Sequence, residues 1–183
     1  MSLFLRGILW FTLYVLLVLA PGAVAVVADP FDTPRPMLVE VSAALGLVAF
    51  AVVAVQFALV SRFQASSRPF GTDALVQFHQ YIGGIALALV IAHPLLLNAA
   101  GMPWGTWIPF GAGLATQSGA IALWALVFLV VTTVLRRRLR LVYEVWQVLH
   151  LGLATLAGGA MLVHVLAVNG YTRAAPVRST LLV

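Results

Sequence analysis

Two stretches of the chain hold all four of its histidines. Residues 76–100 read VQFHQYIGGIALALVIAHPLLLNAA, and residues 143–168 read YEVWQVLHLGLATLAGGAMLVHVLAV. Each stretch is long enough for one membrane-spanning helix, which needs about 20 mostly apolar residues. Each also contains two histidines separated by 14 positions, His79 with His93 and His150 with His164.

The equal spacing places both histidines of a stretch on one helix face. Fourteen residues rise about 21 Å along a helix and turn to within about 40° of a whole number of turns. The two stretches are the third and fifth apolar spans, so they run in the same direction. His79 and His150 then share one level of the membrane, and His93 and His164 share the other. Such a bundle can hold two planar metal cofactors, each between two imidazoles.

The composition indicates an integral membrane protein. Of 183 residues, 63% are hydrophobic and 8% are charged, whereas soluble domains have about 25% charged residues. The mean hydropathy is +1.08. The chain has no cysteine and no lysine, which excludes disulfides, iron–sulfur clusters and lysine Schiff bases. We expect no nucleic-acid partner, because the arginines behind the net charge of +5 gather at the ends of apolar runs.

The predicted fold is all-α, a polytopic membrane helix bundle with five complete spans, at about 7–28, 37–60, 76–100, 118–135 and 143–168. From about residue 176 a further apolar stretch begins, which we interpret as the start of a truncated sixth helix. The first span ends in small residues before Asp29 and Pro30, so a secretory signal is the alternative reading. Its apolar length favours a retained helix.

The arginines predict the orientation. With a cytoplasmic N-terminus, seven of the ten arginines lie inside, and the outer segments carry Arg35, Arg173 and Arg178. The positive-inside rule favours this arrangement, and we expect a multi-pass protein of a bacterial inner (plasma) membrane. The inner arginines are Arg6, Arg62, Arg68, Arg136, Arg137, Arg138 and Arg140.

The histidines allow two other readings. A single histidine in a membrane helix often serves only to bond a neighbouring helix, but two equal spacings on parallel helices fit that reading poorly. A metal-ion path would be expected to include intramembrane carboxylates as well. The only candidates are Glu40 and Glu144, near helix ends.

Small residues near the histidines favour the cofactor reading, although glycine is also common in membrane-helix packing. They leave room for a macrocycle close to the backbone, and Pro94 is expected to bend the helix beside His93. The glycines are Gly83, Gly84, Gly152, Gly158 and Gly159.

The two histidine stretches resemble those of the ferric reductase-like transmembrane domain, a family that includes the NADPH oxidases. The resemblance rests on residues 78–84 (FHQYIGG), 92–96 (AHPLL), 143–151 (YEVWQVLHL) and 163–164 (VH). The inner segment from Ser61 to Gly71 also resembles that family's inner loop. The similarity covers about residues 37–170, and we treat residues 1–183 as one such domain.

The resemblance implies a six-helix domain with two b-type haems, an oxidoreductase that passes electrons across the membrane. Its haem-iron ligands would be His79 and His150 on the inner side, and His93 and His164 on the outer side. FAD and NAD(P)H would bind a cytoplasmic dehydrogenase domain, missing from this sequence or on a partner chain. The acceptor would be a small extracytoplasmic molecule, either oxygen, giving superoxide, or ferric iron.

A second functional class stays open at this point. In a related group of proteins, a haem-binding membrane subunit passes electrons to a separate periplasmic methionine sulfoxide reductase and is not itself catalytic. The roles of Arg35, Glu40 and Arg173 also stay open: they lie where the outer haem edge is expected, but interfacial anchoring explains them equally well.

Overall fold

The computed structural model describes residues 2–28, 34–60, 70–110 and 113–168. The predicted sixth helix and four of the arginines used to orient the chain lie outside these residues. Those arginines are Arg62, Arg68, Arg173 and Arg178.

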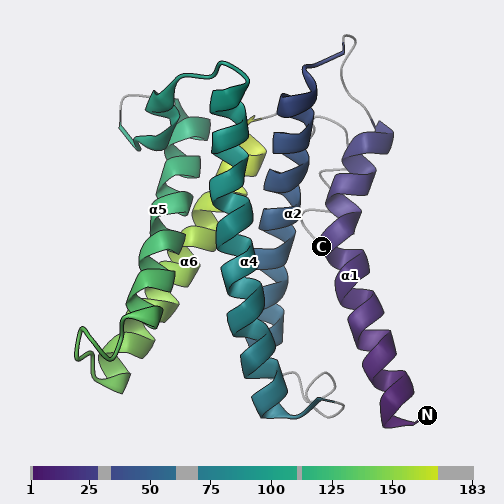
Figure 1. Cartoon of the computed structure of the whole chain (residues 1–183), viewed down its shortest axis with the longest axis vertical. Helices are drawn as coiled ribbons and strands as arrows, with labels where there is room; N and C mark the ends of the chain where they lie inside the picture. The colour runs from purple at the N-terminus through teal and green to yellow at the C-terminus, as the bar shows by residue number, and fades with distance from the viewer. Residues whose placement is uncertain (1, 29–33, 61–69, 111–112, 169–183) are drawn as a thin grey trace.

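Five long α-helices and one short 3₁₀ helix make up the described part (Figure 1). All five long helices are long and apolar enough to cross a membrane, which confirms the all-helical, multi-span prediction. The elements are α1 (Leu3–Ala28), α2 (Met37–Val60), α4 (Thr72–Ala99), η1 (Trp104–Trp107), α5 (Leu114–Val134) and α6 (Tyr143–Val168).

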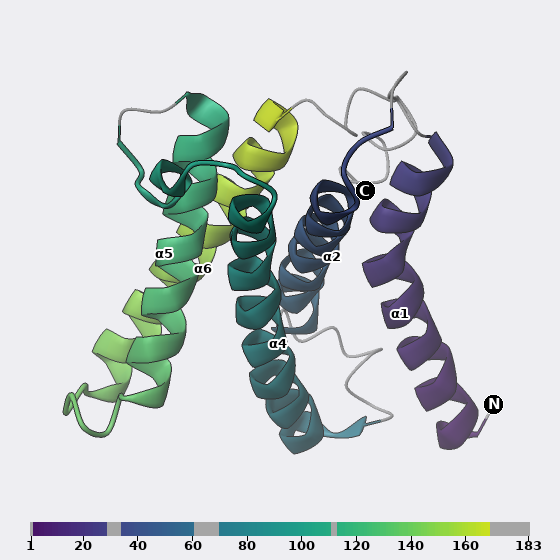
Figure 2. The same cartoon turned by 45° about the horizontal axis from the view of Figure 1, so that its top comes forward.

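The bundle is built from two closely packed helix pairs. α2 packs along α4, and α5 packs along α6, while the contacts between the pairs are much sparser. α1 lies at the edge and packs mainly on α2. α4 and α6 run in the same direction, with α6 behind α4 and α5 in both views (Figures 1 and 2). This parallel course is the arrangement that the histidine spacing requires.

The core lies where the two pairs meet, and its central residues are small. Ala49, Ala86, Ala122 and Ala157 are each at most 3% exposed, and they pack with larger side chains such as Met161. Many large apolar side chains on the outer faces are exposed. In a membrane these faces contact lipid, so the apolar side chains on them do not have to be buried inside the bundle.

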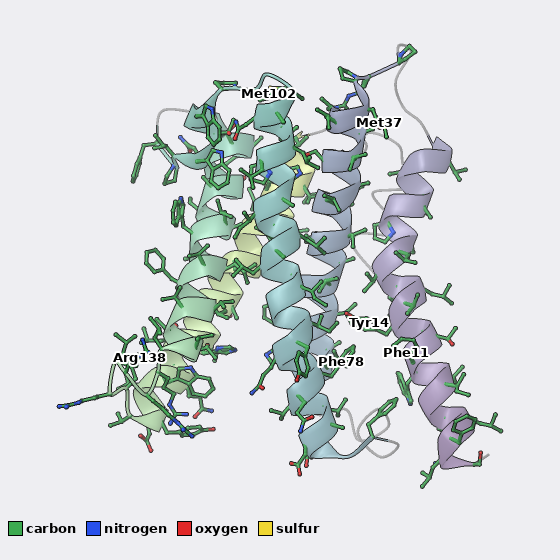
Figure 3. The ribbon with its side chains drawn as sticks, viewed as in Figure 1. Phe11, Tyr14, Met37, Phe78, Met102 and Arg138 are labelled. Carbon is green, nitrogen blue, oxygen red and sulfur yellow. The ribbon has the colours of Figure 1, made fainter. Side chains whose placement is uncertain are left out.

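The two ends of the bundle differ in charge. We call one the basic end, which carries Arg6 and the turn Arg136–Arg140, and the other the tryptophan end, which carries Trp104 and Trp107. Arg138 projects from the basic end, while Met37 and Met102 lie at the tryptophan end (Figure 3). Arg35, before α2, is the one described arginine at the tryptophan end.

Candidate functional site: two histidine pairs between α4 and α6

The four histidines form two pairs, one towards each end of the bundle. His79 and His150, the basic-end pair, have ring centroids 6.2 Å apart. His93 and His164, the tryptophan-end pair, have ring centroids 6.1 Å apart. Each pair joins α4 to α6, although these two helices make few direct backbone contacts. The pairing by level predicted from the 14-residue spacing is the pairing that the structure has.

The ring separation is the one that a single shared metal requires. A ligating imidazole nitrogen lies about 2 Å from its metal, so two imidazoles on opposite sides of one ion have ring centroids about 6 Å apart. The rings are inclined to each other by 63° in the basic-end pair and 76° in the other, so they do not stack. Both pairs therefore have the spacing of axial ligands.

Hydrogen bonds orient the basic-end pair. The His79 Nδ1 donates to Gln56 Oε1 at 3.1 Å, and the Gln56 amide donates back to the His79 carbonyl at 3.0 Å. The Thr133 hydroxyl donates to the Leu129 carbonyl, so its lone pairs accept from His150 Nδ1 at 3.2 Å. The Trp146 ring packs beside the His150 ring, with the two ring centroids 5.2 Å apart.

Backbone carbonyls orient the tryptophan-end pair. His93 Nδ1 donates to the Ser42 carbonyl at 2.7 Å, and His164 Nδ1 donates to the Ala115 carbonyl at 2.6 Å. The Ser42 hydroxyl also donates to the His93 carbonyl at 2.8 Å. All four Nδ1 atoms are thus engaged on α2 or α5, which leaves each Nε2 for a shared metal. Outer partners of this kind fix the tautomer and raise the basicity of a ligating histidine.

Two glycines make room for the tryptophan-end pair. A Cβ on Gly46 would lie 3.0 Å from His93 Nδ1, and one on Gly119 would lie 2.7 Å from His164 Nδ1. No larger residue fits at Gly119 without moving the ring, because real Cβ atoms do not approach so closely.

A cavity of about 350 Å³ reaches the tryptophan-end pair. Its wall is mainly apolar and includes Val90, Leu123 and Met161, with Arg35 at one edge. A second cavity, of about 630 Å³, lies at the basic end beside Thr133 and Trp146, which both contact His150. Its wall carries Arg136, Arg137 and Arg140. The apolar tryptophan-end cavity, with Arg35 in its wall, suits a flat apolar group that bears carboxylates. The wall of the basic-end cavity is half polar and includes neither His79 nor His150.

The number of ligating side chains at each level also indicates which kind of metal centre would fit. Among the described residues, no three or more histidine, cysteine or acidic side chains come together. A bare ion held by two imidazoles would need further ligands. A haem supplies four nitrogen ligands of its own and can accept two more from the protein, so two histidines at each level would suffice to hold one.

The other residues singled out from the sequence are a proline, several glycines and a few charged residues. Pro94 lines the tryptophan-end cavity, and α4 continues through it to Ala99. Glu40 lies in the first turn of α2, where a carboxylate suits the helix dipole, and its Oε1 is 3.6 Å from Arg35 Nε. Arg173 lies outside the described residues. An added Cβ would meet nothing within 4 Å at Gly84, Gly152 and Gly159, whereas at Gly158 it would meet Phe57 at 2.9 Å.

The partners of the histidines were not predicted, although α2 carries a signal for two of them. Ser42 and Gln56 are polar residues in an apolar helix, and they too are 14 positions apart. Both are buried, at 0% and 8% exposure. Because α2 runs antiparallel to α4, Ser42 meets His93 and Gln56 meets His79.

The comparison with protein families agrees with this geometry. The family described as the ferric reductase like transmembrane component matches residues 45–168, which include all four histidines. The chain belongs to this family. Its members generally bind haem and act as oxidoreductases, and the family relationship supports electron transfer across the membrane. Neither the curated proteins nor the solved structures gave a match.

Proposed function

We propose that this ferric reductase-like domain carries electrons across the membrane through two b haems. His79 and His150 would ligate one haem iron, and His93 and His164 the other. The observation that carries the proposal is the pairing itself: two imidazoles from different helices, about 6 Å apart at each level, with both Nδ1 atoms bonded elsewhere. Each haem, when bound, supplies an iron that accepts one electron and passes it on.

The protein's own residues hold, orient and shield these groups. Gln56 and Thr133 fix the imidazoles of the basic-end pair, and the carbonyls of Ser42 and Ala115 fix those of the other. Arg136, Arg137 and Arg140 would hold the haem carboxylates at the basic end, because Arg and carboxylate form strong charge-assisted hydrogen bonds. The buried apolar side chains between the two levels, such as Val90, Leu123 and Met161, would exclude water.

We propose that electrons enter at the basic end and leave at the tryptophan end. Arginine-rich ends of membrane proteins face the cytoplasm, which is where a dehydrogenase carrying FAD and NAD(P)H, fused or separate, would supply electrons. The acceptor outside would be oxygen, giving superoxide, or ferric iron. The alternative is a membrane anchor that serves a separate periplasmic reductase, as the related methionine sulfoxide reductase system does.

Haem content tests the proposal. Purified protein should contain about two haems per chain with a low-spin, six-coordinate spectrum, because two imidazoles would ligate each iron. His79→Ala and His150→Ala should each remove the same haem, and His93→Ala and His164→Ala should each remove the other. Protein that contains no haem although it was expressed with sufficient haem would contradict the proposal. Loss of the same haem from both His79→Ala and His164→Ala would contradict the pairing.

A further inference from the structure

One asparagine holds the loop that follows α4. Asn98 lies in the last turn of α4, and its Oδ1 accepts a 2.6 Å hydrogen bond from Trp107 Nε1. Its Nδ2 donates to the carbonyls of Met102, at 3.0 Å, and Pro103, at 3.2 Å. A single side chain thus makes three hydrogen bonds to the segment 102–107.

The same loop is held from α5. Trp124 Nε1 donates to the Trp107 carbonyl at 2.9 Å. The Trp107 ring is half-buried and packs against the hydrophobic core. Gly101, at φ 94°, makes the turn that brings the loop back towards α4, a conformation that favours glycine. The loop is therefore tied to both helices that it connects.

This fixed loop forms part of the wall of the tryptophan-end cavity. Met102 and Thr106 line the cavity of about 350 Å³ that also reaches His93 and His164. The Thr106 hydroxyl donates to the Pro103 carbonyl, one of the carbonyls that Asn98 holds. The positions of Met102 and Thr106 thus depend on Asn98.

We propose that Asn98 is a positioning residue that sets which molecules reach the His93–His164 pair. By holding Met102 and Thr106 in the cavity wall, it restricts access from the tryptophan end to small molecules. The inference deepens the proposed function, since the molecule admitted there would be the electron acceptor. The restriction itself is a property of the cavity and is measurable without electron transfer.

Cysteine labelling provides that measurement, because the chain has no cysteine of its own. Ala43→Cys places a reporter in the cavity wall, and Met37→Cys places one at the same end on a side chain that is 80% exposed. Each reporter is combined with Asn98→Ala in the purified full chain, whose haem content is measured in parallel. Labelling rates are measured with methyl methanethiosulfonate, which is small, and with a polyethylene-glycol maleimide, which is bulky.

Asn98→Ala should speed the labelling of Ala43→Cys by the bulky reagent about tenfold or more, since the three hydrogen bonds that hold the loop to α4 are lost. The small reagent should be affected much less, and labelling at position 37 should not change. Trp107→Phe, which removes the Nε1 donor together with the five-membered part of the indole ring, should act in the same direction. Trp104→Leu is the matched control: Trp104 stacks on Trp107 but does not line the cavity.

Acceptor selectivity provides the second measurement. In dithionite-reduced protein, Asn98→Ala should raise the oxidation rate by ferric EDTA relative to that by oxygen, while Trp104→Leu leaves the ratio unchanged. Unchanged labelling and an unchanged ratio in both Asn98→Ala and Trp107→Phe would overturn the inference. A protein that binds no haem would instead contradict the proposed function, and the labelling result would still decide the role of Asn98.

Discussion

At the scale of single residues, the four histidines differ mainly in what their Nδ1 atoms bond. In the tryptophan-end pair the closest acceptors are backbone carbonyls at 2.6–2.7 Å, with Ser42 Oγ also 3.0 Å from His93 Nδ1. In the basic-end pair the only acceptors among the described residues are side-chain oxygens at 3.1–3.2 Å. Side-chain acceptors can be removed by substitution, so the basic-end pair is where the role of these hydrogen bonds is open to direct measurement.

Thr133→Val should weaken the basic-end site. The change keeps the shape of the side chain but removes the acceptor for His150 Nδ1, and with it the longer 3.4 Å contact from Trp146 Nε1. Haem affinity there should fall about 10-fold to 100-fold. The reduction potential of that haem should rise, because a less basic imidazole stabilises ferric iron less. Redox titration with haem quantification measures both effects.

Thr132→Val is the matched control for this prediction. The Thr132 hydroxyl bonds only carbonyls of its own helix, those of Phe128 and Leu129. Neither haem content nor either potential should change. Equal effects of the two substitutions would show that Thr133 acts through α5 and not through His150.

Gly119→Ala should damage the other site. The new Cβ would lie 2.7 Å from His164 Nδ1, so the ring must shift and lose its bond to the Ala115 carbonyl. Overpacking of this kind costs about 1–3 kcal/mol. The haem ligated by His93 and His164 should be depleted, or should become high-spin, in the absorption spectrum. Gly22→Ala, whose Cβ would meet only Val48 at an ordinary 3.8 Å, should retain both haems.

At the scale of helices, the approximate bounds expected from the sequence lie closer to the structure for two elements than for three. α2 and α6 have the predicted bounds of 37–60 and 143–168, whereas α1, α4 and α5 each begin four residues earlier than predicted. In α4 and α5 the extra turn includes polar residues such as Asp73 and Gln117. Hydropathy falls at the membrane surface, but helical hydrogen bonding continues there, so hydropathy alone places a helix start too late.

The pairing of the histidines was predictable because it depends on one helix period and one direction. Their partners were not, because Ser42, Gln56 and Ala115 lie on helices whose rotation about their own axes the sequence does not specify. A backbone acceptor such as the Ala115 carbonyl is independent of residue type. Only the repeated 14-residue spacing of Ser42 and Gln56 hinted at these contacts.

The sparse contact between α4 and α6 predicts a specific pattern of stability. Bound haems would join these helices, so each bis-histidine site should behave as one energetic unit. His79→Ala combined with His150→Ala should cost no more stability than either change alone, because the first already releases the haem. His79→Ala combined with His164→Ala should cost close to the sum, because two sites are lost.

Thermal unfolding of the haem-loaded protein in detergent provides the comparison. Equal non-additivity in both double variants would mean that the two levels form a single unit. Additivity in the first double variant would mean that His79 and His150 stabilise the bundle independently of any shared group.

At the scale of the whole molecule, the described residues keep the charge asymmetry on which the orientation depends. Arg6 and Arg136–Arg140 mark the basic end, and Arg35, with Glu40 beside it, lies at the other. Three arginines of the basic end line a cavity next to the contacts of His150. The same end is thus suited both to face the cytoplasm and to receive electrons from a soluble donor.

Single cysteines in whole cells test this orientation. Leu139 lies in the arginine turn, its side chain is 50% exposed, and Leu139→Cys places a cysteine there. Gly105→Cys places a cysteine in η1, where an added Cβ would meet nothing within 4 Å. Both changes keep every arginine. Under the positive-inside rule, a membrane-impermeant maleimide should label Gly105→Cys in intact cells and Leu139→Cys only after permeabilisation. The opposite pattern would place the basic end outside, where no NAD(P)H is present, and electrons would then have to enter at the His93–His164 pair.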